Sequence, residues 1–188
     1  RIEAESPLGG SVASLASDGS RFQLLDVRGN QFLTGAASPC NIARLLRVGL
    51  TPADVVAVVA GSVPRLDGPT TTEVGWDGEG SGHDTLTLKS PDGRTEVIRF
   101  TPKDQGGDIA GAELKDPAGK PVWTITHADF SDAGGARLPE RTDITQPARN
   151  ADARIRWRSR EVKADVPDTI FHLTPPPGLP VEEVTCTE

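Results

Sequence analysis

The chain has 188 residues, a formal net charge of −7 and 36% hydrophobic residues, with 20 glycines and 16 prolines. This length is enough for one domain with a hydrophobic core, so we expect a single domain over residues 1–188. The acidic balance argues against a nucleic-acid partner, because proteins that bind nucleic acid usually present a basic face. No apolar run approaches the ~20 residues of a membrane-spanning helix.

Residues 1–35 are expected to form short strands joined by turns. The sequences SDGS and RGN are typical of hairpin turns. Between them, RFQLLDV places Phe22 and Leu24 on one face of a strand and Arg21 and Gln23 on the other. This strand is therefore expected to be half buried.

Residues 38–66 predict two short helices. Ser38 suits an N-cap, Pro39 suits the first helical position, and Gly49 suits the end of this first helix. Pro52 repeats the start signal, and the sequence DVVAVVAG makes the second helix apolar nearly all round. Such a helix is normally buried on more than one side. We expect the two helices to cover a sheet.

From residue 70 onward, the pattern returns to strands. SPDGR and DPAGK are turn sequences between alternating apolar and polar segments, so each predicts a hairpin. Further on, ARIRWRSR alternates cationic side chains with other residues, and one face of that strand is cationic: Arg154, Arg156, Arg158 and Arg160. This face is either solvated or able to meet anionic headgroups or a partner. A Pro-rich extended tail, about 174–188, ends the chain.

The order of elements predicts a mainly β fold of the α+β class. Strands, a helical pair and a long meander favour sequential antiparallel pairing. We expect a curved antiparallel sheet that forms an open or half β-barrel, covered by a short helical lid at about 38–66. No βαβ alternation is present, which excludes the doubly wound folds.

The sequence shows no reactive constellation. The histidines at 83, 127 and 172 have neither HExxH spacing nor a nucleophile elbow nearby, so we expect surface or half-buried side chains. GEGSG lacks the lysine of a P-loop, and we expect a flexible turn there. We expect no enzyme, no metal site and no cofactor.

The two cysteines, Cys40 and Cys186, lie near opposite ends of the chain. An isolated pair has neither zinc-site nor CxxC spacing. They form either one disulfide or two buried free thiols. In the entropy model, a disulfide that closes so long a loop stabilises by roughly 4–5 kcal/mol.

Three stretches carry a family resemblance. The first is RIEAESPLGGSVASLASDGSRFQLLDVRGNQFLTG, with an SPLG segment, a DG turn and an LxD strand. The second is the helical stretch 38–66, and the third is ARLPERTDITQP followed by ARIRWRSREVKADVPDTIFHLTPPPGLPVEEV. In this order, they resemble the LolA/LolB-like family of bacterial envelope proteins, and LolB-like lipoproteins in particular. The protruding loop with an exposed bulky apolar tip, typical of LolB-type proteins, is not evident.

The resemblance implies a half-barrel whose apolar hollow receives a lipid or the acyl chain of a lipoprotein. It implies a non-enzymatic, monomeric lipoprotein in the bacterial periplasm, tethered to the outer membrane by a lipid ahead of residue 1, that serves lipoprotein or lipid trafficking. The alternative is an envelope protein–protein interaction module with a side-chain-filled barrel and no ligand. The side chains expected to line the hollow and lid are Ile42, Leu45, Leu46, Val55, Val56, Val59, Leu86, Leu88, Trp123, Ile125 and Trp157.

Overall fold

The computed structural model describes residues 1–6, 9–41, 49–79, 82–102, 104, 107–162 and 164–186. The chain divides into two compact units, Arg1–Pro52 with Lys163–Glu188, and Ala53–Val162. We call these the first and the second unit and describe each by itself. The expectation of a single domain stays a prediction. Within the described residues, no helix combines the length and the hydropathy that a membrane crossing requires.

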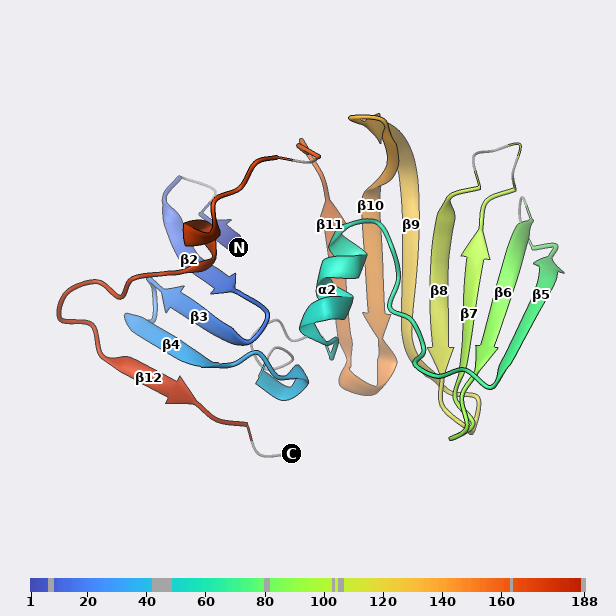
Figure 1. Ribbon diagram of the computed structural model, residues 1–188, viewed down its shortest axis with the longest axis horizontal. Coiled ribbons are helices and arrows are strands. Elements are labelled where there is room, and N and C mark those ends of the chain that lie inside the picture. Colours follow the sequence, from blue (N-terminus) through green and yellow to red (C-terminus); the bar gives the residue numbers. More distant parts are fainter. Residues whose placement is uncertain are drawn as a thin grey trace. The chain divides into compact units, whose positions relative to one another are not determined.

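The first unit contains an open sheet with the strand order β1-β2-β3-β4-β12, the smaller sheet (Figure 1). The first four strands pair sequentially and antiparallel, as residues 1–35 predict. The last strand instead pairs with β4 in parallel, so part of the expected extended tail belongs to this sheet. The elements are β1 (Ile2–Glu5), β2 (Ser11–Ser17), β3 (Arg21–Asp26), β4 (Gln31–Ala36), the 3-10 helix η3 (Asp168–Phe171) and β12 (Val181–Val184).

Phe22 and Phe32 are buried in the first unit, with 0% and 2% of their surfaces exposed, and they lie on opposite faces of the smaller sheet. Gly35 lies opposite Phe22 in the antiparallel pair. A Cβ atom at Gly35 would lie 2.5 Å from the Val184 carbonyl oxygen and 2.9 Å from Cε1 of Phe22. Glycine is therefore what lets β12 and the Phe22 ring both approach β4 closely.

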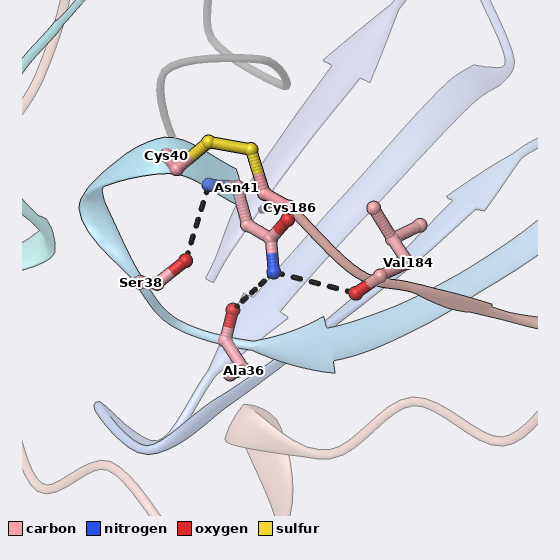
Figure 2. Close-up of a disulfide and its surroundings, with 6 residues drawn as sticks. All are labelled: Ala36, Ser38, Cys40, Asn41, Val184 and Cys186. Atoms are coloured by element: carbon pink, nitrogen blue, oxygen red, sulfur yellow. Dashed lines mark hydrogen bonds between the residues drawn. A yellow bond between two sulfur atoms is a disulfide. The ribbon is translucent and has the colours of Figure 1, made fainter. Parts of the chain in front are cut away.

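A disulfide between Cys40 and Cys186 joins the segment after β4 to the segment after β12, with the two Cα atoms 5.9 Å apart (Figure 2). Beside it, the buried Asn41 donates from Nδ2 to the Ala36 carbonyl at 2.9 Å and the Val184 carbonyl at 3.4 Å. Of the two states open to the cysteines, the structure has the bonded one.

A helix begins at Pro39, the residue where the sequence predicts its first turn. The Ser38 hydroxyl accepts a hydrogen bond from the Asn41 backbone N–H at 3.2 Å, which is the contact of an N-cap (Figure 2). The continuation of this predicted helix, over residues 42–48, lies outside the described residues.

The second unit contains an open antiparallel sheet with the order β11-β10-β9-β8-β7-β6-β5, the larger sheet (Figure 1). Each strand pairs with its neighbours in sequence, as predicted. The turns SPDGR and DPAGK close two of its hairpins, with Ser90 N–H to Arg94 oxygen at 3.0 Å and Asp116 N–H to Lys120 oxygen at 2.9 Å. The elements are β5 (Thr71–Asp77), β6 (His83–Lys89), β7 (Thr95–Phe100), β8 (Ile109–Lys115), β9 (Pro121–Ala133), β10 (Ala136–Gln146), the 3-10 helix η2 (Pro147–Arg149) and β11 (Ala151–Arg156).

Helix α2 (Pro52–Val59) is the second predicted helix. Its Val58 is buried, but Val56 is 68% exposed. The expectation that this helix is buried on more than one side is therefore wrong at Val56. An all-apolar sequence has no polar stripe to show which of its sides faces solvent, so only packing makes that choice. The helix ends before Gly61, which has a φ of 82°.

Candidate functional site

The larger sheet has one apolar and one polar face. In its register, Leu114 lies opposite Trp123, and Ile125 lies opposite both Ala112 and Ile144. All five of these side chains are buried. Because side chains alternate along a strand, the residues between them point to the other face. That other face carries ion pairs, for example Lys89 with Glu73, Arg99 with Asp77, and Lys115 with Glu113.

The segment 60–66, which we call the strap, follows α2 and crosses β10, β9 and β7 (Figure 1). Its start lies against β10, because a Cβ atom at Gly61 would lie only 2.7 Å from Cδ of Pro139. Val63 and Leu66 in the strap are 3% and 8% exposed. The strap therefore buries its own apolar side chains and covers the central strands.

His127 of β9 holds the first half of the strap. Its Nε2 is 2.9 Å from the Ser62 carbonyl oxygen, and its Nδ1 is 2.9 Å from the Thr142 hydroxyl. A carbonyl oxygen can only accept, so Nε2 carries the proton and Nδ1 accepts from Thr142. Burial lowers the pKa of His127, which keeps the ring neutral and suits this arrangement. The expectation of a surface or half-buried histidine is wrong here, because His127 is 4% exposed.

Glu96 of β7 holds the second half of the strap. Its Oε2 accepts a hydrogen bond from the Leu66 backbone N–H at 2.6 Å. The side chain is 0% exposed, and Leu88 and Leu114 lie opposite it on the two neighbouring strands. Its second oxygen, Oε1, has no hydrogen-bond partner among the described residues. The strap thus covers a carboxyl group that uses only one of its two oxygens.

Burial raises the pKa of Glu96 from its usual 4.5 to about 7. The Leu66 N–H and the Arg65 charge act in the opposite direction, whereas the Asp54 charge adds to the rise. Loss of water is the dominant cause, because a charged carboxylate in apolar surroundings is disfavoured. Near neutral pH this carboxyl group therefore exists in both protonation states.

Toward β5, the apolar face opens to solvent. Val74 lies opposite Leu86 and is 83% exposed, and Trp76 on the same strand is 59% exposed. The Trp76 ring lies over Gly82, where a Cβ atom would be 2.1 Å from Cζ2 of the ring. Large exposed apolar side chains that continue a buried apolar face are typical of a binding surface.

The structure places four of the residues predicted for the hollow on the apolar face. Leu88, Trp123 and Ile125 are buried on the apolar face, and Leu86 is half buried there. Trp157 follows β11 and is half buried, with the Arg160 guanidinium 4.3 Å from its ring centre.

The residues predicted for the lid differ from one another in burial. Val55 and Val59 on α2 are half buried, whereas Val56 faces solvent. Ile42, Leu45 and Leu46 lie outside the described residues.

The predicted lid includes residues 60–66, but as helix and not as the non-helical strap. Glu96, His127 and Val74 were not predicted as parts of this site. One signal was present: in TEVIRF, Glu96 has the same alternation as Ile98 and Phe100, so an acidic residue occupies an apolar-face position. Nothing local shows that Leu66, far back in the chain, covers it.

The predicted cationic face is confirmed for Arg154 and Arg156, since the residues of β11 alternate between half buried and exposed. It is wrong for Arg160, because β11 ends at Arg156 and the Arg160 side chain is half buried beside the Trp157 ring. Arg154 pairs with Asp143. Arg156 and Arg158 are exposed. Among the described residues, no three His, Cys, Asp or Glu side chains lie close enough together to hold a metal ion.

The geometry defines a mainly β protein with two open sheets, one of which has a strap across its apolar face. No family model matches the chain, and no curated protein matches it in sequence.

Two solved structures are similar to it. A DUF1329 family protein from Desulfovibrio piger has 12% identity and a TM-score of 0.52, over 81% of this chain and 62% of that protein's chain. A LolA superfamily protein from Nitrosomonas europaea has 13% identity and a TM-score of 0.49, over 90% of this chain and 73% of that one. The first similarity shows a shared fold, and this chain spans less than two thirds of the DUF1329 protein's length.

Proposed function

We propose that this protein binds a lipid or the acyl chain of a lipoprotein on the apolar face of the larger sheet. One observation carries the proposal: the buried apolar face continues through Leu86 to Val74, which is 83% exposed, and Trp76, on the same face opposite Asp84, is 59% exposed. A protein that needed this face only as a core would bury its largest side chains. The resemblance to LolA/LolB-like proteins supports the same kind of ligand.

Binding in this proposal needs no chemistry. Each methylene group of an acyl chain that leaves water contributes about 0.8 kcal/mol, so a chain laid along the face gains affinity from its length. Entry starts at the open end near β5, where Val74 and Trp76 already meet solvent. Release follows when the strap closes again or when an acceptor with higher affinity is present.

The cellular setting is part of the proposal. A LolB-like role places the protein in the bacterial periplasm, tethered to the outer membrane by an N-terminal lipid, where it handles lipids or lipoproteins as a monomer. The disulfide between Cys40 and Cys186 suits an oxidising compartment of this kind.

A second candidate is an envelope interaction module that binds no lipid. One observation favours it: Val63, Pro64 and Leu66 of the strap are buried, so side chains already fill the centre of the apolar face. In that case Val74 and Trp76 contact another protein. The two candidates differ in whether a free acyl chain binds at all.

Uptake of a fluorescent fatty-acid methyl ester, which carries no carboxylate, by the purified protein tests the proposal. Val74→Asp places a charge at the open end, and we expect it to abolish uptake. Val27→Asp is the matched control, because Val27 is also an exposed valine, at 49%, but follows β3 of the smaller sheet. Uptake that Val74→Asp leaves unchanged contradicts the proposed site. A wild-type protein that takes up no lipid, either from the probe or from its own envelope, favours the second candidate.

A further inference from the structure

The strap occupies the part of the apolar face where Glu96 lies. The Leu66 backbone N–H donates to Oε2 of Glu96 at 2.6 Å, and the side chains of Val63 and Leu66 in the strap are buried. The strap therefore presents to the sheet an apolar surface with one hydrogen-bond donor in it. Opposite, the sheet presents an apolar surface with one carboxyl group in it.

A ligand that lies along the covered strands must move the strap and so remove the Leu66 N–H from Glu96. Leaving a buried acceptor without its donor costs more free energy than one ordinary hydrogen bond contributes. One oxygen of Glu96, Oε1, already lacks a hydrogen-bond partner among the described residues. A plain hydrocarbon cannot restore the lost bond, whereas an acyl chain with its own donor can.

We propose that the ligand of this face is an acyl chain linked through a hydrogen-bond donor, such as an amide N–H, that takes the place of the Leu66 N–H at Glu96. This inference rests on the proposed lipid-binding function and narrows it to a ligand class. A free fatty acid fits poorly, because its carboxylate would join the carboxyl groups of Glu96 and Asp54, and among the described residues only the Arg65 charge opposes them at Glu96. In general, a site built around a buried polar group discriminates strongly against ligands that leave it unpaired.

A pair of ligands that differ in one group tests the inference. N-methylhexadecanamide and methyl hexadecanoate have the same chain and shape, but the amide N–H is replaced by an ester oxygen. Each competes with the neutral fluorescent probe N-phenyl-1-naphthylamine for the wild-type protein at pH 8.5, where the Glu96 carboxyl group, with a pKa of about 7, is ionised and can only accept. We expect the amide to bind about tenfold or more tightly than the ester, the effect of one hydrogen bond to a carboxyl group.

Two variants assign that preference to Glu96. Glu96→Met keeps a straight side chain without an acceptor, and we expect it to bind amide and ester equally. Glu73→Met makes the same change on the opposite, polar face of the sheet, where Glu73 pairs with Lys89, and we expect the tenfold preference to persist. Hydrogen exchange gives an independent measurement, because amide binding should release the Leu66 N–H to exchange with solvent.

The outcomes separate this inference from the function on which it rests. If amide and ester bind the wild type equally, lipid binding stands and the inference is overturned. A preference that survives in Glu96→Met, or a Leu66 amide that stays protected in the complex, also overturns it. If neither ligand displaces the probe, the proposed function fails and the inference fails with it.

Discussion

Replacing Glu96 by glutamine should change how the stability of the second unit depends on pH. The pKa of Glu96 is raised from its usual 4.5 to about 7, and burial is the main cause. The folded state therefore binds the proton more tightly than the unfolded state does. The resulting stability is fully present below about pH 4.5 and is lost as the pH rises through about 7.

The size of this loss follows from the two pKa values. One pH unit between them corresponds to about 1.36 kcal/mol, so the interval from 4.5 to about 7 corresponds to about 3 kcal/mol. Part of the loss occurs below pH 5, which leaves about 2.5 kcal/mol between pH 5 and pH 8. Glu96→Gln has no charge to bury, so this part of the decline should disappear.

Tryptophan fluorescence during urea unfolding measures the effect, because all three tryptophans, Trp76, Trp123 and Trp157, lie in the second unit. The quantity compared is the unfolding free energy of Glu96→Gln minus that of the wild type. We expect this difference to rise by about 2.5 kcal/mol from pH 5 to pH 8. The other titrating groups contribute equally to both proteins, so their contributions cancel in this difference. His127 is one of them, because its lowered pKa makes stability fall as the pH falls.

Glu73→Gln serves as the control, because Glu73 is exposed on the polar face and its pairing with Lys89 spans 3.5 Å. The plot of unfolding free energy against pH for Glu73→Gln should run parallel to that of the wild type. Parallel curves for Glu96→Gln as well would refute the reasoning, since they would mean that Glu96 is ionised in the folded protein at no cost.

Three further changes should alter stability. Replacing Cys40 and Cys186 by serine removes a loop closure over 146 residues and should lower the unfolding free energy by up to about 5 kcal/mol, measured by urea unfolding. Gly111→Ala should cost about 3 kcal/mol by the same measurement, because its φ is 154° and a Cβ would lie 2.2 Å from the Ile125 oxygen. Asn41→Leu removes the amide that donates hydrogen bonds to the Ala36 and Val184 carbonyl oxygens and should cost about 2 kcal/mol, seen as a lower melting temperature.

Each of these changes has its own control. A reducing agent should destabilise the wild type but leave the cysteine-free variant unchanged, and an equal effect on both would contradict the role of the disulfide. Gly119→Ala shares a positive φ, 79°, but has no atom within 4 Å of the new Cβ. If Gly111→Ala costs no more than Gly119→Ala, the clash with Ile125 is not the cause. A melting temperature that Asn41→Leu leaves unchanged would show that its two hydrogen bonds contribute little.

Local patterns in the sequence were enough to predict the hairpins. SPDGR and DPAGK predict their turns because the side chains and backbone of a few neighbouring residues decide a turn. Alternation then predicts which residues of a strand share a face, as the β11 arginines show. Sequential antiparallel pairing needs only short loops, so the order of the larger sheet follows from the same patterns.

The sequence by itself therefore determined the mainly β class, most strand positions and the two faces of strands such as β3 and β11. Only the tertiary structure decided which distant segments meet: β12 beside β4, the strap across β7 to β10, and Val56 toward solvent. The physical reason is that alternation shows a side chain's direction but not what will cover it. Glu96 shows the difference: its face follows from TEVIRF, but its burial and raised pKa depend on Leu66, 30 residues earlier in the chain.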